Sequence, residues 1–342
     1  MPENPSATPQ HQQCFQTGTI SIVMSDPGNE TLGAEPPSAW AVATAFVLIY
    51  LSWGTTYFVT GYSMQSLQMP PALYGGVRLL LAGAILLAFQ GCRGQSLRIG
   101  LTDALRLIPV SVCLFLMGNW LINLGQRQVP SGVAAVLIAT TPLWIALFEM
   151  FWPQGERLRW RGWIGLVLGF GGIVITLAPQ IQDGLSFVED YHVLFVLGSA
   201  ASWAIGSLLS RHSEVKLPHL TSAGVQMIFG GICQTTLGTA LGEWPALMAK
   251  IDGRAIGAFT YLLIVGSLTG FVAFNWLLGH VSAAKVGTYA YVNPIVAVFI
   301  GWVMSETPVT AALLTGIAVV LVGVYLVRSD HVLSKEIELE PD

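Results

Sequence analysis

The sequence predicts an all-α, polytopic membrane protein with ten transmembrane helices arranged as two inverted five-helix repeats. Three observations support this fold class. Hydrophobic residues make up 53% of the 342 residues and charged residues only 10%, against about 25% charged residues in soluble domains. The apolar residues gather in stretches of roughly 20, the length that a helix needs to cross a bilayer. An apolar span interrupted by proline occurs twice, once around Pro142 and again around Pro294.

Residues 1–37 precede the first apolar stretch and differ from it in composition. They contain several Pro, Asn and Gln and no Lys or Arg, so they lack the basic start and apolar run of a secretory signal. We expect a disordered, cytoplasmic tail here, with Met24 as an alternative start that would make residues 1–23 an extension. A second cytoplasmic tail is expected at 329–342.

Ten apolar stretches follow, and their short connections leave no room for a soluble domain. Met69-Pro70-Pro71 separates the first two, because proline cannot donate a backbone hydrogen bond and disfavours helix at the preceding residue. The first five stretches form an expected repeat over 38–180, and the last five a second repeat over 190–328. The expected spans are 40–61, 71–90, 107–126, 129–151, 162–179, 192–211, 219–241, 256–279, 283–304 and 308–327.

The distribution of basic residues predicts the orientation. With the N-terminus inside, eleven Lys and Arg residues fall in the inside segments, and only Arg127, Lys250 and Arg254 fall outside. This excess favours cytoplasmic N- and C-termini. Because five helices per repeat is an odd number, the second repeat must enter the membrane from the opposite side, which makes the repeats inverted.

The two halves share short motifs in the same order. Each proline lies inside its span, where it kinks a helix, and a repeated, interrupted span is a sequence pointer to a transporter's binding site. The matching pairs are Pro142 with Pro294, Asn123 with Asn275, Ser52-Trp53-Gly54 with Ser202-Trp203-Ala204, Gly76-Val77-Arg78 with Gly224-Val225-Gln226, Gly165 and Gly172 with Gly316 and Gly323, and Glu156 with Glu306.

Several of these motifs together resemble a known family. They are Trp53 to Phe58, Pro71 with Gly76-Val77-Arg78, Val129 to Ala135 leading to Pro142, Ser202-Trp203-Ala204 with Gly206-Ser207, Tyr289 to Pro294, and Glu306-Thr307. Over about residues 40–327 the chain is similar to the EamA-type ten-helix permeases of the drug/metabolite transporter superfamily. The resemblance implies an inner-membrane permease that moves small metabolites, often outward, with amino acids among the cargoes. It also implies a central cavity lined by helices 1, 3, 4, 6, 8 and 9.

Arg78 is the sharpest candidate for a substrate contact, because it lies seven residues into the second span. Charged groups inside a bilayer are costly and face a cavity or a partner, and a guanidinium forms paired bonds to a carboxylate. The alternatives are an ion pair within the protein or a side chain extended to the interface. Gln226 occupies the corresponding position in the second half.

Glu149, at the end of the fourth span, is the main candidate for a coupling proton carrier, because no Asp falls within any span. The alternative is an acid near the lipid headgroups, balanced by Arg157 to Arg161. We expect Glu156 and Glu306 to begin the helices that follow them, where an acid suits the positive end of the helix dipole.

Polar and aromatic residues four apart share a helix face, and four such faces fall on helices that the resemblance assigns to the cavity. An aromatic and amide lining suits a small amphipathic solute; the alternative is interhelical packing. The predicted cavity residues are Trp53, Tyr57, Arg78, Asn119, Asn123, Trp203, Ser207, Gln226, Asn275, Tyr289 and Asn293.

We expect a secondary transporter in the cell inner membrane that acts by alternating access on a small-molecule substrate. The sequence predicts no cofactor, no metal site and no nucleic-acid partner; it leaves a homodimer open. A membrane-embedded enzyme is the weakest alternative, because the chain has no H-x-x-x-H or G-x-S-x-G motif and thus no pattern for a metal pair or nucleophile. A sensor or scaffold of the same fold that moves no solute is the other alternative.

Overall fold

The computed structural model describes residues 37–95, 97–152, 155, 157–182, 191–213, 215, 217–278, 280–281 and 283–339. Apart from Pro37, the expected N-terminal tail lies outside these residues, as does Glu156. The described part of the chain is all-α, with no strand. The last helix continues to Leu339, so it includes most of the segment expected as a C-terminal tail.

The first repeat contributes five crossings, two of which are not continuous α-helices. The third crossing contains a π-helical segment, and the fourth is broken between Ile138 and Thr141. In order, the elements are α1 (Ala39–Gln65), α2 (Pro71–Cys92), α3 (Leu101–Ser111), η1 (Val112–Gly118), α4 (Asn119–Gly125), α5 (Ser131–Ile138), α6 (Thr141–Glu149) and α7 (Trp160–Gln182).

The second repeat has the same sequence of features. Its third crossing again contains a π-helical segment, and its fourth is again broken. The elements are α8 (Tyr191–His212), α9 (His219–Ala240), the short α10 (Trp244–Ala249), α11 (Gly253–Tyr261), η2 (Leu262–Thr269), α12 (Gly270–Leu278), α13 (Ala283–Val286), α14 (Tyr289–Val303) and α15 (Ala311–Leu339). Within the described residues, eight crossings are long and apolar enough to span a membrane. The other two are α9, which is more polar, and the shorter apolar α14.

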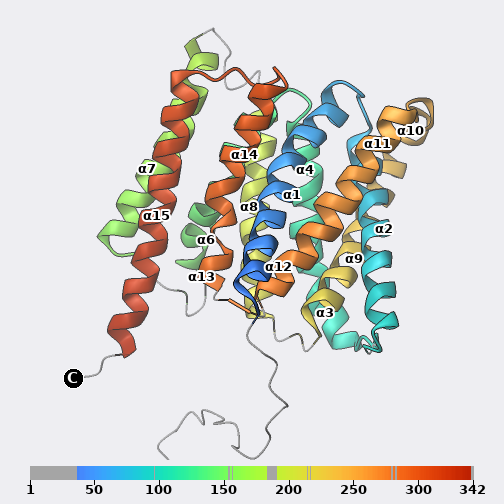
Figure 1. The fold of residues 1–342 in the computed structure, drawn as a ribbon, viewed down its shortest axis with the longest axis horizontal. Coiled ribbons are helices and arrows are strands. Elements are labelled where there is room, and N and C mark those ends of the chain that lie inside the picture. The colour runs from blue at the N-terminus through green and yellow to red at the C-terminus, as the bar shows by residue number, and fades with distance from the viewer. Residues whose placement is uncertain are drawn as a thin grey trace, which may run out of the picture. The chain divides into compact units, whose positions relative to one another are not determined.

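Corresponding helices of the two repeats pack against each other. In Figure 1, α7 (green) runs beside α15 (red), and α2 (cyan) runs beside α9 (yellow). Glycines allow the close approach: a Cβ on Gly165 would lie 2.7 Å from the Gly323 carbonyl oxygen, and one on Gly83 would lie 2.7 Å from that of Gly224. Small residues at helix crossings are how membrane helices bring their backbones together.

The first helix of each repeat packs on the other repeat. Helix α1 contacts η2, α12 and α14, whereas α8 contacts η1, α4, α5 and α6. The first helix of each repeat therefore packs over the third and fourth crossings of the other repeat, which are the interrupted ones. This reciprocal packing is what a pseudo-twofold relation between inverted repeats produces.

The two prolines occupy different places relative to the breaks. Pro142 lies in the first turn of α6, where its missing N–H costs nothing. Helix α14 instead runs without interruption through Pro294, and the break in this crossing lies upstream, at Gly287 and Thr288. The Gly287 carbonyl accepts a hydrogen bond from Arg328 of α15 (3.0 Å). The two broken crossings are therefore related in position but not identical.

Candidate functional site

A polar group lies between α2, α4 and α9, inside an otherwise apolar bundle. Gly75 of α2 is its centre: a Cβ built there would lie 2.7 Å from Asn119 Oδ1, 2.7 Å from Gln234 Nε2 and 2.8 Å from Asn123 Nδ2. Only a glycine leaves room for three amide side chains at this point of α2. The structure therefore brings together Asn119 and Asn123, which were predicted to line the cavity, with Gln234, which was not among the predicted cavity residues.

Arg78 follows Gly75 by one turn on the same helix. The residue is 8% exposed, and a long helical side chain extends back over the turn N-terminal to its own Cα. That turn contains Tyr74, whose hydroxyl hydrogen-bonds Ser63 of α1 (3.0 Å). The structure therefore places Arg78 near Tyr74, one turn along α2 from the glycine where the three amides converge.

An aromatic group lies around Trp53 of α1. Its indole Nε1 donates to the Gly266 carbonyl in η2 (3.1 Å), and its ring packs edge-on against Tyr289 with a centroid distance of 5.0 Å. Phe271 and Phe274 of α12 complete the group. Tyr57 lies one turn further along α1, near Tyr289. Three predicted cavity residues, Trp53, Tyr57 and Tyr289, are thus neighbours.

The corresponding region of the other half is built differently. Trp203 of α8 packs against Phe115 of η1 at a centroid distance of 6.2 Å, but the bonds to the π-helical segment come from serines. Ser199 donates to the Gly118 carbonyl (2.7 Å) and Ser202 to the Cys113 carbonyl (2.8 Å). In each half, side chains of the first helix of one repeat therefore satisfy π-helical carbonyls of the other.

Three other predicted residues bond within their own helices. The Ser207 hydroxyl donates to the Trp203 carbonyl (2.7 Å), Gln226 to Ser222 (3.0 Å) and Asn275 to the Phe271 carbonyl (2.8 Å). Asn123, the counterpart of Asn275, instead bonds across helices to the Pro71 carbonyl (3.1 Å). Asn293 is 5% exposed, and its Oδ1 has no partner within the described residues.

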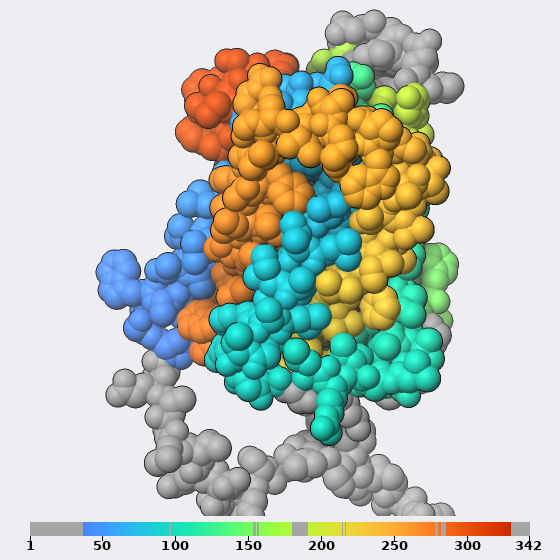
Figure 2. Space-filling view, turned by 90° about the vertical axis from the view of Figure 1, so that its right-hand side faces the viewer, coloured from blue at the N-terminus to red at the C-terminus, as the bar shows by residue number. Residues whose placement is uncertain are grey.

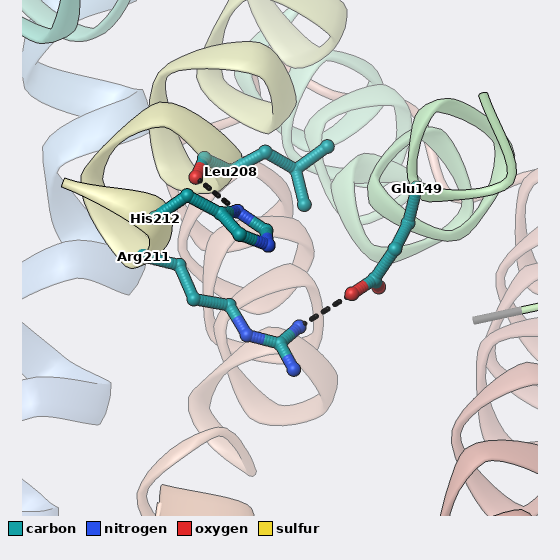
Figure 3. Close-up of polar contacts among 4 residues, drawn as sticks. All are labelled: Glu149, Leu208, Arg211 and His212. Atoms are coloured by element: carbon teal, nitrogen blue, oxygen red, sulfur yellow. Dashed lines mark hydrogen bonds and ion pairs between the residues drawn. The ribbon is translucent and has the colours of Figure 1, made fainter. Parts of the chain in front are cut away.

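Glu149 forms an ion pair that the sequence did not indicate. Its carboxylate lies 2.7 Å from the Arg211 guanidinium at the end of α8 (Figure 3). The Glu149 side chain is 6% exposed and that of Arg211 51%, so the pair lies at the edge of the bundle. The neighbouring His212 ring hydrogen-bonds the Leu208 carbonyl (2.9 Å) and stacks on Trp152.

Two hollows lie at this end of the bundle. One of about 290 Å³ is bordered by Arg106, Trp152 and His212, close to the Glu149–Arg211 pair. An apolar one of about 380 Å³ lies between α2, α3 and α9, with Leu87, Ala104 and Val225 among its walls. Figure 2 shows this side of the molecule, with α2 in cyan beside α9 in yellow and the α3 region in teal below.

The opposite end of the bundle is held by two carboxylates. Glu306 accepts hydrogen bonds from the Ser131 N–H (2.9 Å) and from the Ser131 hydroxyl, at the start of α5. Thr307 accepts from the next N–H, that of Gly132 (3.2 Å). We expected Glu306 to begin the helix that follows it; this was wrong, because its carboxylate turns back to satisfy the free N–H groups of a helix in the other repeat.

Glu243 does the same for α2. Its carboxylate accepts from the N–H of Leu73 (2.8 Å) and that of Ala72 (3.5 Å). Burial raises the pKa of this carboxyl above its ordinary value, and the two N–H bonds and the charge of Arg127 oppose the rise. Sequence reasoning missed Glu243. A signal was present: Glu243 follows Gly242, which lies just after the end of α9 as Gly94 lies just after the end of α2 in the first repeat. Both glycines have a positive φ, 70° at Gly242 and 73° at Gly94.

Comparison with known proteins gives a consistent result. A model of the EamA-like transporter family matches the chain twice, over residues 40–178 and 191–329. The uncharacterized inner membrane transporter YedA of Escherichia coli (strain K12) is 34% identical over 260 residues, covering 75% of this chain and 80% of that protein. The uncharacterized transporter YvbV of Bacillus subtilis (strain 168) is 24% identical over 296 residues, covering 86% and 93%. A crystal structure with a TM-score of 0.61 and 21% identity covers 86% of this chain and 99% of its own, which supports the fold alone.

Proposed function

The chain belongs to the EamA-like transporter family, and on that premise we propose that it is a secondary transporter that exports small metabolites across the cell inner membrane. The family and the named relatives make it a multi-pass membrane transporter and point away from an enzyme. The cargo class that fits best is amino acids or related amphipathic solutes, moved by alternating access of the two repeats.

The reciprocal packing of the two repeats is the observation that carries this proposal. Each first helix, α1 or α8, covers the π-interrupted and broken crossings of the other repeat. Two similar, opposed bundles can rock about a site between them, and broken helices supply backbone groups that line such a site. The fold therefore contains the parts that alternating access requires.

The chemistry of the interior supports a small amphipathic cargo. The aromatic group around Trp53 and Tyr289 offers ring faces, and the amides Asn119, Asn123 and Asn293 offer hydrogen bonds. A site with apolar walls and a few polar groups suits solutes that carry both kinds of surface. Trp203, Ser207, Gln226 and Asn275 belong to the same proposed lining, on the faces of α8, α9 and α12.

We assign Glu149 to proton coupling on the same basis. A carboxylate that takes up a proton loses its negative charge and with it the charge attraction to a guanidinium, so protonation would release α6 from Arg211 of α8. Helix α6 is half of the broken fourth crossing, and α8 is the helix that packs over it. Loss of the ion pair would therefore alter the packing between α6 and α8.

Counterflow in liposomes tests the proposed function. Purified protein is reconstituted with a mixture of amino acids, organic cations and sugars inside, and uptake of the labelled mixture is read by mass spectrometry. A transporter exchanges at least one class faster than empty liposomes do. A sensor or scaffold binds solute without exchange, and that result, with a known carrier active in the same preparation, contradicts the proposal.

A further inference from the structure

An apolar groove lies on the surface of the bundle where α2, α3 and α9 meet. Its volume is about 380 Å³, and its walls are apolar, with Leu87, Leu101, Ala104, Val225 and Phe229 among them. Figure 2 shows this face of the molecule, with α2 in cyan, α9 in yellow and the α3 region in teal. We call this hollow the inner groove, because it lies at the end of the bundle that the basic residues predict to be inside.

The inner groove lies at the depth of the acyl chains of the inner leaflet. Val225 and Phe229 lie roughly 9 and 15 Å along α9 from its first residue, at a rise of about 1.5 Å per residue. One leaflet contributes about 15 Å of hydrocarbon to a bilayer. Leu101 is 76% exposed, so the groove is open to its surroundings at the inner end.

A groove with such walls does not stay empty in a membrane. Apolar walls offer a water molecule no hydrogen bonds, and atoms beside an empty space lose the dispersion contacts that a neighbour would provide. A hydrocarbon chain supplies those contacts and needs no polar partner. The medium around the protein at this depth consists of such chains.

The second repeat fills the corresponding junction with its own chain. The connection between α9 and α11 contains the short helix α10, which packs on α2. Leu247 of α10 is buried with Leu73 and Tyr74 of α2 and with Ala255 of α11. The matching connection of the first repeat, between α2 and α3, contains no helix in its described residues.

One pair of residues shows the difference directly. Ile99 stands as far after Gly94 as Leu247 stands after Gly242, and these two glycines follow the matching helices α2 and α9. Leu247 is 9% exposed within its cluster, whereas Ile99 is 37% exposed in the wall of the inner groove. The first repeat therefore leaves open a junction that the second repeat closes with a side chain.

The connection that borders the inner groove is basic. Residues 93–106 contain Arg93, Arg98 and Arg106 and a single acid, Asp103. Arg106 borders the other hollow at this end of the bundle, whereas Arg93 and Arg98 are exposed in the connection itself. A guanidinium matches the oxygens of a phosphate, and basic pockets at the cytoplasmic side of membrane proteins bind anionic lipid headgroups.

The connection folds back over α2 next to the inner groove. A Cβ on Gly91, one turn after the groove residue Leu87, would lie 3.3 Å from the Leu97 side chain. Arg98 and Ile99 follow Leu97 directly, and Ile99 is part of the groove wall. The basic connection and the apolar groove are therefore adjacent, in the order in which a phospholipid presents its headgroup and its chains.

From these observations we propose that the inner groove binds an acyl chain of an anionic phospholipid of the inner leaflet, with the phosphate of its headgroup near Arg93 and Arg98. The chain takes the place that Leu247 of α10 takes in the second repeat. It contacts α2 and α3 of one repeat and α9 of the other, so it joins the two repeats at this end. The site lies on the surface of the bundle and does not rest on the proposed transport function.

Lipid retained by the purified protein tests the headgroup. The protein is washed in detergent that contains equal amounts of dioleoyl phosphatidylglycerol, which is anionic, and dioleoyl phosphatidylcholine, which has no net charge. Native mass spectrometry then counts the lipid that stays bound. The wild type should retain phosphatidylglycerol in preference to phosphatidylcholine. Arg93→Gln and Arg98→Gln should each lower this preference about fivefold, which is what one basic residue near a membrane surface contributes.

Filling the inner groove tests the acyl chain. Ala104→Trp places an indole ring in the groove and should abolish retention of both lipids. Ala88→Trp makes the same change at an exposed position of α2 outside the groove and should retain lipid as the wild type does. Arg254→Gln changes an exposed arginine at the opposite end that pairs with Asp252, and it should leave the preference unchanged.

The possible results decide between occupants. Retention of no phospholipid by the wild type, equal retention of the two lipids, or unchanged retention in Ala104→Trp would each overturn the proposal. A wild-type dimer without lipid that Ala104→Trp converts to monomers would overturn it by showing that a second copy of the chain covers the groove. The arginine variants change only exposed side chains, so they test the site without altering the packing, and size-exclusion profiles confirm that each variant folds.

Discussion

At the scale of single residues, Arg78 and Glu149 show how the surroundings of a charged side chain within the bundle determine what it can do. Arg78 and Glu149 both lie near the middle or end of an apolar span in the sequence, and both were candidates for function. The structure separates them: Glu149 has a partner 2.7 Å away in Arg211, whereas Arg78 Nε has no hydrogen-bond partner among the described residues. Glu149 is thus one member of an ion pair that can be broken, and Arg78 is a buried cation with no carboxylate partner in the described part of the chain.

Substitution of Glu149 tests proton coupling. Glu149→Gln keeps the shape of the side chain and removes its charge, so Arg211 loses its carboxylate partner at every pH. We expect flux driven by a pH gradient to be abolished while solute exchange at equal pH continues, because exchange needs no net proton movement. Both rates are measured in the same liposomes. An unchanged response to the pH gradient would remove Glu149 from the coupling mechanism.

Glu243 makes stability depend on pH. Burial raises its pKa in the folded protein, so the folded state holds this proton more tightly than the unfolded chain does. The resulting stability is fully present below the ordinary glutamate pKa of about 4.3 and is lost as the pH rises through the raised value. The melting temperature of the wild type should therefore fall relative to that of Glu243→Gln as the pH rises from the ordinary glutamate pKa through the raised one. Parallel curves would show that the carboxyl does not contribute.

At the scale of elements, two helix N-termini are capped by carboxylates from the opposite repeat. Glu306 satisfies the start of α5, and Glu243 the start of α2. These bonds tie the end of a second-repeat helix to the beginning of a first-repeat helix. They hold one end of the bundle together while the hollows lie at the other end.

Removal of the Glu306 cap should loosen that end. Glu306→Ala leaves the Ser131 N–H and hydroxyl without an acceptor, so we expect a loss of about 1.5–3 kcal/mol, the usual value for hydrogen bonds to a charged group. Glu306→Gln keeps one acceptor and should lose less. Unfolding of the purified variants by denaturant measures both. A similar loss in the two variants would mean that the cap is not what stabilises this end.

The sequence predicted the helices well and their interruptions poorly. Composition and length indicate where an apolar helix lies, and they located all ten crossings. The π-helical segments η1 and η2 carry no such signal, because Val112–Gly118 and Leu262–Thr269 are as apolar as their neighbours. Their carbonyls are satisfied by Ser199, Ser202 and Trp53 from distant helices, and only the tertiary structure shows this.

The same limit applies to the candidate site. Arg78, Asn119 and Asn123 stand out in the sequence because polar residues are rare in spans. Gln234 and Thr235 lie on α9, the most polar of the crossings, where an extra amide or hydroxyl does not by itself indicate a functional site. They belong to the polar group because they face Gly75 and Gly76 of the neighbouring helix α2. The spacing of residues within one helix does not predict such a contact between two helices.

At the scale of the whole molecule, the basic residues predict the orientation in the membrane, and this prediction can be tested directly. Ser66 and Gln95 are exposed and lie in the first and second connections. In a background without the native cysteines, Ser66→Cys should react with an impermeant thiol reagent added to intact cells. Gln95→Cys should react only after the cells are permeabilised. The reverse pattern would place the N-terminus outside.

The exchange of first helices between the repeats bears on how such a chain arose. Because α1 completes the second repeat and α8 completes the first, neither half is a finished structure by itself. Two separate copies of a five-helix ancestor, inserted in opposite directions, would complete each other in the same way. Once joined in one gene, two such copies would keep their orientations, and each could change independently. A cation could then be kept at Arg78 in one half and replaced by an amide at Gln226 in the other.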